Sequence, residues 1–180
     1  AKRALMNPNS YNVWIGPTYL KSKIGFRYMR AFLPQIDGIK AIEGNLEIKI
    51  SNGSYIKFLH GQDAETTVEG EAIDNFVIDE SGKQQKQLWY SLLTTLTQTK
   101  GKGIVTGTPK GSNWYHEIFR RAKQGDPFYC WAHLKTSDSP YVSAEAIANA
   151  KRILPKPLFD QYYEAQFISS GSVFGDGGGF

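Results

Sequence analysis

Two adjacent carboxylates follow a short apolar run near the middle of the chain. The run Phe76-Val77-Ile78 leads directly into Asp79 and Glu80. An apolar run of this length favours a buried strand, so we expect both carboxylates at a strand tip. There, one carboxylate can hold a hydrated Mg²⁺ bound to phosphate oxygens, and the other can orient and deprotonate a water molecule for attack on phosphorus. The alternative is a strand that ends in a solvated acidic turn.

A second apolar run ends in small hydroxyl residues. Ile104 and Val105 precede Thr106, Gly107 and Thr108. Threonine hydroxyls beside a glycine can hydrogen-bond a terminal phosphate or its attacking water, and they can change position when that phosphate leaves. The alternative is an ordinary exit from a strand into a turn rich in glycine and proline. If the two apolar runs form neighbouring strands, phosphate chemistry becomes the better interpretation.

A third candidate is basic. A short apolar segment runs into Pro17-Thr18 and then into a helix whose first turns carry Lys21 and Lys23. Backbone N–H groups at a helix start bind anions, and nearby lysines suit a phosphate backbone. The alternative is simply a capped, basic helix. The candidate nucleic-acid contacts, all weaker than the carboxylate pair, are Lys21, Lys23, Lys110, Arg120 and Arg121.

Charge is spread unevenly along the 180 residues, although the net charge is only +4 and the pI is about 9.0. Residues 1–36 hold six basic residues and no acid, residues 61–82 hold seven acids and no base, and residues 100–123 hold six basic residues and one acid. One interpretation is a set of solvated faces that alternate in sign. The other is a pair of basic surfaces that flank an acidic, metal-binding edge.

Composition excludes several classes of protein. The chain is 41% apolar, which is enough for a packed core, and its single cysteine excludes an internal disulfide and a cysteine metal cage. We expect Cys130 to lie in the core of a strand. No apolar run approaches the ~18 residues of a membrane helix, and no signal peptide is recognisable. The sequence therefore favours a cytosolic, reducing setting.

Short apolar strands alternate with amphipathic helices, which predicts an α/β fold with a mostly parallel sheet covered on both faces. Ligands of such sheets lie at the carboxyl ends of the strands. In the helix 19–33 the apolar residues Leu20, Ile24, Tyr28 and Phe32 recur at i+4 spacing. The expected strands are 12–16, a hairpin of 46–50 and 55–59, 75–79, 103–106 and 128–134, and the expected helices are 19–33, 84–98, 112–123, 144–153 and 158–167.

The order of these motifs resembles the ATPase domain of the terminase large subunit of tailed bacteriophages, the motor that packages DNA. The resemblance covers nearly the whole chain, and it is the ordered set of motifs that is specific. The matching pieces are VWIGPTY (13–19), the NGS turn (52–54), FVIDES (76–81), TGTPKGS (106–112), TSDSPY (136–141), and YYEAQF with VF (162–167, 173–174).

The resemblance implies a RecA-like P-loop NTPase core over residues 1–174, followed by a flexible glycine-rich tail over 175–180. It implies an ATPase that drives double-stranded DNA into a procapsid, with Asp79 as the Walker B acid on Mg²⁺, Glu80 as the catalytic base, and Thr106, Gly107 and Thr108 as the coupling motif. The implied partners are the portal protein, a small terminase subunit, a C-terminal nuclease domain and further copies in a ring. The implied location is the host cytoplasm, transiently on the procapsid portal, without a membrane.

The chain also departs from the family pattern. It has no Gly-x-x-x-x-Gly-Lys-Ser/Thr sequence, the Walker A loop that wraps phosphates. In the family that loop precedes the Pro-Thr strand, so residues 1–8 resemble the tail of the following helix, and we expect the isolated chain to be inactive. We expect no nuclease site within these 180 residues, since Asp176 stands alone in a glycine run. Where many relatives carry an arginine before a glycine, this chain has Glu69-Gly70, which leaves the arginine finger unassigned.

Three alternatives stay open. The first is a fragment of a helicase-like nucleic-acid translocase. Two observations speak against it: Asp79-Glu80 is followed by Ser81-Gly82, and no second RecA lobe is recognisable in this sequence. The second is a non-catalytic DNA-binding or assembly module that uses the basic segments 1–36 and 100–123. The third is a structural α/β domain whose acidic strand tip has no function.

Overall fold

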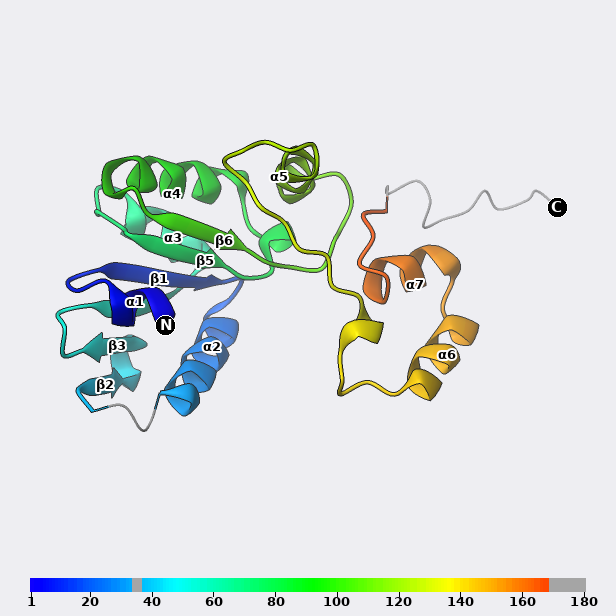
Figure 1. The fold of residues 1–180 in the computed structure, drawn as a ribbon, viewed down its shortest axis with the longest axis horizontal. Coiled ribbons are helices and arrows are strands. Elements are labelled where there is room, and N and C mark those ends of the chain that lie inside the picture. Colours follow the sequence, from blue (N-terminus) through cyan, green and yellow to red (C-terminus); the bar gives the residue numbers. More distant parts are fainter. Residues whose placement is uncertain (34–36, 169–180) are drawn as a thin grey trace. The chain divides into compact units, whose positions relative to one another are not determined.

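A six-stranded sheet forms the first of two compact units of the chain (Figure 1). The computed structural model describes residues 1–33 and 37–168; the first unit is Ala1–Thr106. The strand order in the sheet is β2-β3-β4-β1-β5-β6. The strands are β1 (Tyr11–Gly16), β2 (Ile39–Ile42), β3 (Glu47–Ile50), β4 (Tyr55–His60), β5 (Asn75–Ile78) and β6 (Lys102–Val105).

Four of these strands run parallel, and two form an antiparallel extension. In the parallel part, β1 pairs with β4 and β5, and β5 pairs with β6. The strands β2 and β3 add the antiparallel hairpin beside β4. Ile78 is in register with Ile15 on one side and with Val105 on the other, so β1, β5 and β6 end level with one another. The predicted fold class, a mostly parallel sheet with an antiparallel hairpin, is confirmed.

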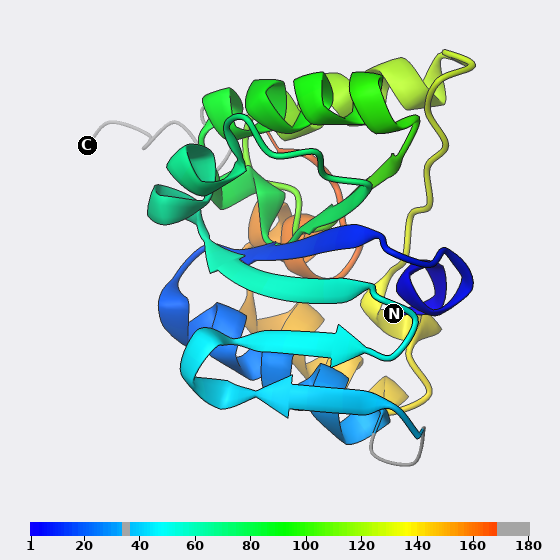
Figure 2. The same cartoon turned by 90° about the vertical axis from the view of Figure 1, so that its left-hand side faces the viewer.

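Helices cover both faces of this sheet (Figures 1 and 2). One face carries α2, and the opposite face carries α3 and α4. Thr18 begins α2 as the sequence suggested, because its hydroxyl accepts a hydrogen bond from the Lys21 N–H at 3.3 Å. The helices of this unit are α1 (Lys2–Met6), α2 (Tyr19–Phe32), α3 (Gly61–Val68) and α4 (Lys86–Thr99), with short 3₁₀ turns η1 (Glu43–Asn45) and η2 (Ser81–Lys83).

The face of α2 that packs on the sheet is not the one that the i+4 pattern predicted. Leu20, Tyr28 and Phe32 are 64%, 68% and 84% exposed, whereas Phe26 is fully buried and meets Phe58 edge to face at 5.6 Å. The cause is the indole of Trp14, which occupies the space between β1 and the helix. Only small residues fit against it, and a Cβ on Gly25 would lie 2.9 Å from the ring. The large apolar row is therefore turned outward.

The opposite face of the sheet packs against α4. Leu88, Trp89 and Leu92 of α4 are buried, and the Trp89 ring meets Phe76 of β5 at 5.9 Å. Gly103 of β6 is in register with Phe76, and a Cβ there would lie 2.2 Å from the Phe76 ring. The glycine thus leaves room for the aromatic ring that anchors α4.

The Asn-Gly turn between β3 and β4 also forms as predicted, with Gly53 at φ +86°. Its side chains fasten α1 to the sheet. The Asn52 side-chain amide donates to the carbonyl of Ala4 at 2.9 Å, and the Ser54 hydroxyl donates to the carbonyl of Asn7 at 2.7 Å. The turn therefore holds the N-terminal helix as well as reversing the chain.

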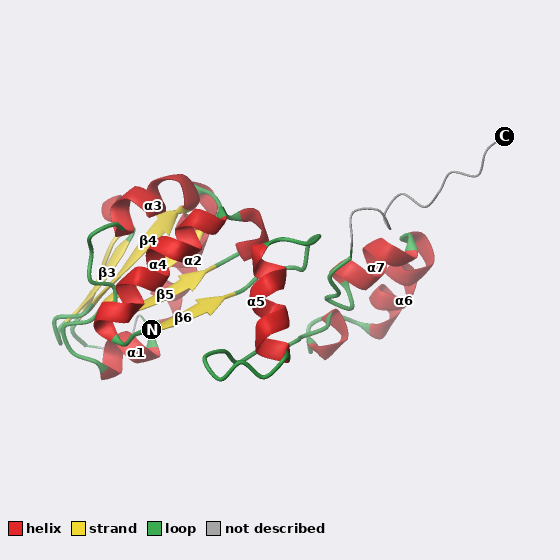
Figure 3. Ribbon diagram, turned by 90° about the horizontal axis from the view of Figure 1, so that it is seen from above, coloured by secondary structure: helices red, strands yellow, loops and turns green. Residues whose placement is uncertain are grey.

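The second unit is described over residues 107–168 and is helical (Figure 3). It contains α5 (Trp114–Lys123), η3 (Thr136–Asp138), α6 (Ala144–Ile153) and α7 (Lys156–Tyr162), so the last predicted helix begins and ends earlier than 158–167. Among the described residues, no helix is long and apolar enough to cross a membrane. The predicted end of the compact structure near Phe174 and the predicted tail 175–180 lie outside the described residues.

The predicted strand 128–134 does not form, and Cys130 is exposed rather than in a core. Two rings of this segment pack against α5, whereas Phe128 and Leu134 are exposed. Trp131 and His133 contact the ring of Phe119 on α5 at 5.6 and 6.4 Å. The segment is held by these ring contacts and has no ladder of backbone hydrogen bonds to the described strands of the sheet, so it does not become a strand.

Candidate functional site

The carboxyl ends of four parallel strands bring chemically active residues to one edge of the sheet. β4 ends at His60, which is in register with Gly16 at the end of β1. β5 and β6 end one residue before Asp79 and Thr106. This row is the expected ligand edge of a parallel α/β sheet.

Asp79 is held in place from both neighbouring strands. Its backbone N–H donates to the carbonyl of Ile15 at 2.8 Å, which continues the ladder to β1. On the other side, the Thr106 hydroxyl donates to the Asp79 carboxylate oxygen Oδ1 at 3.1 Å. The structure therefore brings together the first two motifs of the sequence, which are separated by 27 residues along the chain.

Glu80 turns the chain away from the strand. It has φ +52° and ψ +44°, a left-handed conformation that costs a non-glycine residue about 1 kcal/mol. The next residue, Ser81, is fully buried and compensates: its N–H donates to the carbonyl of Thr106 at 2.8 Å and its hydroxyl to the carbonyl of Ile78 at 2.9 Å. The Glu80 carboxylate is 29% exposed and lies 3.1 Å from the Lys83 ammonium.

Gly107 and Thr108 follow Thr106 directly but belong to the second unit. The carbonyl of Gly107 accepts a hydrogen bond from the Tyr115 hydroxyl at 3.2 Å, and Thr108 is exposed. Burial raises the pKa of Tyr115, so its hydroxyl stays protonated and available as the donor. The segment 106–108 thus begins in the first unit and continues in the second, where Tyr115 anchors Gly107.

The five candidate nucleic-acid contacts divide between the two units. Lys21 and Lys23 lie on α2, where Lys21 is exposed and Lys23 pairs with Glu43 at 3.4 Å. In the second unit Lys110 and Arg120 are exposed, while Arg121 is held by Asp126 at 2.9 Å and lies over the Tyr129 ring at 5.2 Å. Arg121 is therefore the least available of the five.

Two further residues at the same edge escaped the sequence analysis. Gln84 is buried, and its side-chain amide donates to the carbonyl of Asp79 at 3.4 Å. His60 lies 2.7 Å from Asp63 and meets the Tyr19 ring edge to face at 6.1 Å. His60 directly follows the predicted strand 55–59, so its place at the carboxyl edge could have been predicted. No sequence pattern indicates that Gln84 lies there.

The edge could hold a hydrated cation beside a phosphate. Mg²⁺ in such sites takes one or two carboxylates and completes its shell with waters and phosphate oxygens. Asp79 supplies the carboxylate and Thr106 the adjacent hydroxyl, so the residues present fit. The acidic segment as a whole is not a metal cage, because no group of three or more His, Cys, Asp or Glu side chains with metal-binding geometry occurs among the described residues.

Comparison with known proteins assigns the chain to a family. Residues 1–174 match the family described as "Terminase large subunit, T4likevirus-type, N-terminal". The chain belongs to this terminase family. A terminase large subunit of Escherichia phage T5 is 27% identical over 178 residues, which are 94% of this chain and 40% of that protein. The chain thus spans less than half of that terminase.

Solved terminase structures share the fold. The large terminase ATPase domain of Thermus phage P74-26 superposes with a TM-score of 0.77 at 19% identity, covering 92% of this chain and 80% of that one. The large terminase of another thermophilic bacteriophage, solved in complex with ADP, gives a TM-score of 0.74 at 12% identity, covering 89% of this chain and 41% of that one. The RecA-like core expected from the terminase resemblance is therefore confirmed as the fold.

Proposed function

We propose that this chain is the ATP-hydrolysing motor region of a phage terminase, which drives double-stranded DNA into a procapsid. The observation that carries the proposal is the hydrogen bond between Thr106 and Asp79 at the carboxyl edge of the sheet. It joins a carboxylate suited to Mg²⁺ with a hydroxyl suited to a terminal phosphate. The family membership and the relatives' bound nucleotides, ADP and ATP-γ-S, support the same conclusion.

In this proposal Asp79 would hold Mg²⁺ beside ATP, and the bound ion would supply positive charge to balance the charge that develops on the phosphates. Glu80 is the base. It orients a water molecule and takes its proton as the water attacks the terminal phosphorus, and its position one residue past Asp79 places a second carboxylate at the same edge. Lys83 must leave the Glu80 carboxylate, or share it, when that water binds.

Thr106, Gly107 and Thr108 form the proposed coupling segment. The Thr106 hydroxyl can bond either Asp79 or a phosphate oxygen, so loss of the terminal phosphate changes its partner. The following residues enter the second unit, where Gly107 is bound by Tyr115. A shift at Thr106 would in this way be passed along the backbone into the second unit.

The proposed partners follow from the family. They are double-stranded DNA, the portal protein, a small terminase subunit, a C-terminal nuclease domain and further copies in a ring, in the host cytoplasm at the portal. Lys21, Lys23, Lys110, Arg120 and Arg121 are the proposed DNA contacts. Because no Walker A sequence is present, we propose that the 180 residues alone hydrolyse little ATP.

The test is the substitution Glu80→Gln in a terminase form that also contains a Walker A loop. We expect ATP turnover to fall about 100-fold or more, because the general base is lost, while ATP binding persists. Glu145→Gln, which changes an exposed carboxylate of α6 far along the chain from Glu80, is the matched control and should turn over normally. Turnover that survives Glu80→Gln would refute the assignment of the base.

The alternative that retains support is a non-catalytic DNA-binding module, because three of the five candidate contacts (Lys21, Lys110 and Arg120) are exposed without a described ion pair. A titration with duplex DNA over a range of salt concentrations separates it from the motor. A steep salt dependence that nucleotide does not alter would favour the module.

A further inference from the structure

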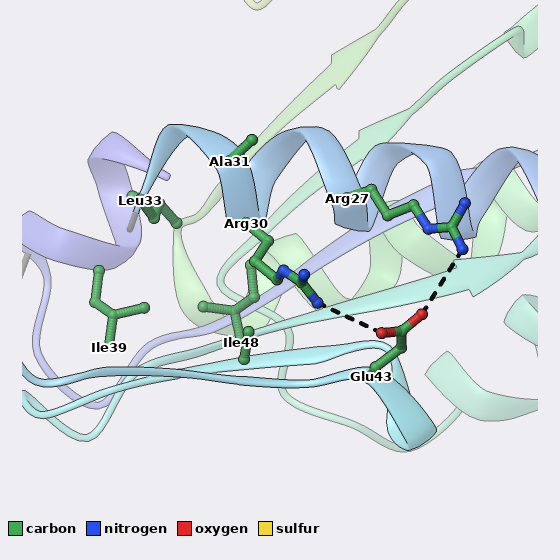
Figure 4. Close-up of a pocket in the computed structure, with 8 residues that line it drawn as sticks. Arg27, Arg30, Ala31, Leu33, Ile39, Glu43 and Ile48 are labelled. Atoms are coloured by element: carbon green, nitrogen blue, oxygen red, sulfur yellow. Dashed lines mark hydrogen bonds and ion pairs between the residues drawn. The ribbon is translucent and has the colours of Figure 1, made fainter. Parts of the chain in front are cut away.

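A groove with a basic rim and an apolar floor lies between α2 and the β2–β3 hairpin (Figure 4). Its volume is about 560 Å³. Arg27 and Arg30 of α2 form the rim and reach toward Glu43, each toward a different oxygen of that carboxylate, at 3.8 and 3.4 Å. The floor consists of Ala31, Leu33, Ile39, Ala41 and Ile48. We name these eight residues the basic groove.

The charge in the basic groove is not balanced. Lys23 also reaches Glu43, so three cations share one carboxylate. The guanidinium groups are more than half exposed, and a guanidinium carries more N–H donors than these long contacts use. An anionic partner with a small apolar group would therefore complement both the charge of the rim and the apolar floor.

The same chain carries a complementary feature on the far side of the sheet. Residues 69–72, Glu-Gly-Glu-Ala, form an exposed loop after α3, and neither carboxylate makes an ion pair with the described residues. Val68 and Ile73, which flank the loop, are fully buried, and the Glu71 N–H donates to the carbonyl of Val68 at 3.2 Å. We name residues 69–72 the acidic loop. It is a short, anchored turn that presents two carboxylates.

One copy cannot join its own loop to its own groove. α2 lies on one face of the sheet and α3 on the other, so the sheet separates the two features (Figure 2). Glu71 is held near the amino edge of the sheet, where its charge contributes to the raised pKa of Tyr11 and Tyr55. A contact between them must therefore be intermolecular.

We infer that the acidic loop of one copy docks into the basic groove of the next. Glu69 and Glu71 would meet Arg27 and Arg30, and Ala72 would bring the small apolar group to the floor. Such a contact joins two different surfaces, so it is head-to-tail, and repetition produces either a closed ring or an open filament. The association itself does not depend on ATP hydrolysis; only the expectation of closure into a ring rests on the proposed function.

The inference is tested by exchanging charges and measuring mass by sedimentation velocity without nucleotide. We expect the unaltered chain to associate as its concentration rises, more strongly at about 50 mM than at about 500 mM salt. Arg27→Glu with Arg30→Glu, and separately Glu69→Lys with Glu71→Lys, should each weaken association about tenfold or more. A mixture of the two variants should associate again, because each then offers the charge that the other lacks.

A matched control reverses two positive charges on the hairpin that borders the groove. Lys40 and Lys49 lie opposite one another on β2 and β3, are exposed and do not line the groove, so Lys40→Glu with Lys49→Glu should leave association unchanged. Circular dichroism must show that every variant is folded; if the arginine variant is not, Arg27→Gln with Arg30→Gln replaces it.

Three results would overturn the inference. The unaltered chain could stay monomeric at both salt concentrations. The mixture could fail to restore association. Or the arginine variant could lose affinity for duplex DNA while the mass of the chain never changes, which would assign the groove to nucleic acid instead.

Discussion

The Thr106 hydroxyl donates a hydrogen bond of 3.1 Å to the Asp79 carboxylate, and so joins the tips of β6 and β5. The Ser81 N–H donates a hydrogen bond of 2.8 Å to the Thr106 carbonyl, so the backbone joins the same two tips a second time. The two motifs are therefore linked, and a displacement of either strand tip should alter the position of the other.

Thr106→Val removes the hydroxyl and keeps the shape of the side chain. Because Thr106 is exposed, we expect the free energy of unfolding to change by less than about 1 kcal/mol, while ATP turnover in a form with a Walker A loop falls about tenfold. Urea unfolding and a phosphate-release assay measure the two effects. Thr94→Val, which removes an exposed hydroxyl from α4, is the control, and equal turnover in the two variants would contradict a role for Thr106.

Ser81→Ala removes a fully buried hydroxyl that donates to the Ile78 carbonyl at 2.9 Å. The loss should destabilise the first unit by about 1 kcal/mol, because the carbonyl loses a hydrogen bond in a site that water does not reach. Urea unfolding followed by circular dichroism measures it. Ser112→Ala, at an exposed position, should have no measurable effect; a neutral result at Ser81 would show that this turn does not stabilise the tip.

Gly25→Ala tests the close approach of α2 to Trp14. Alanine favours a helix over glycine by about 1 kcal/mol, so helix propensity alone predicts a gain in stability. We expect a loss of about 1–3 kcal/mol instead, because the new Cβ would lie 2.9 Å from the indole. Gly44→Ala, where no atom lies within 4 Å, is the control. A higher melting temperature for Gly25→Ala would refute this account of the packing.

Stability should fall in alkali because of Tyr11. Burial, with smaller contributions from Tyr55, Glu71 and Glu47, raises the pKa of Tyr11 above its ordinary value of 10.0. Below about pH 10 the phenol is protonated in both the folded and the unfolded chain, so it gives no pH dependence. Above that pH the unfolded chain releases the proton and the folded one keeps it, which favours unfolding. The urea midpoint should therefore drop between about pH 10 and pH 11, and Tyr11→Phe should reduce that drop.

Local patterns were sufficient to predict the strand tips. Asp79 and Thr106 each follow an apolar run, and parallel strands align their carboxyl ends, so their proximity could be expected from the sequence. The left-handed turn at Glu80 and the reach of Gln84 back to the Asp79 carbonyl could not, because they depend on the buried position of Ser81 and on the approach of Gly61 to Gln84.

The errors of the sequence analysis arose where tertiary packing overrode a local pattern. The apolar row of α2 faces outward because Trp14 requires small residues beneath the helix. The segment 128–134 has the apolar character of a strand but packs against Phe119, so Cys130 is exposed. The elements α1, β2 and α3 are short, and no periodic pattern marks them.

The most direct test of the central claim is a crystal structure of a longer terminase form that contains this chain and a Walker A loop, bound to Mg²⁺ and ATP-γ-S. The account predicts the metal beside the Asp79 carboxylate, the terminal phosphate within hydrogen-bond distance of the Thr106 hydroxyl, and Glu80 facing the water in line with that phosphate. A nucleotide bound at any other edge of the sheet would contradict it. So would a nucleotide whose phosphates and metal lie beyond contact distance of both Thr106 and Asp79.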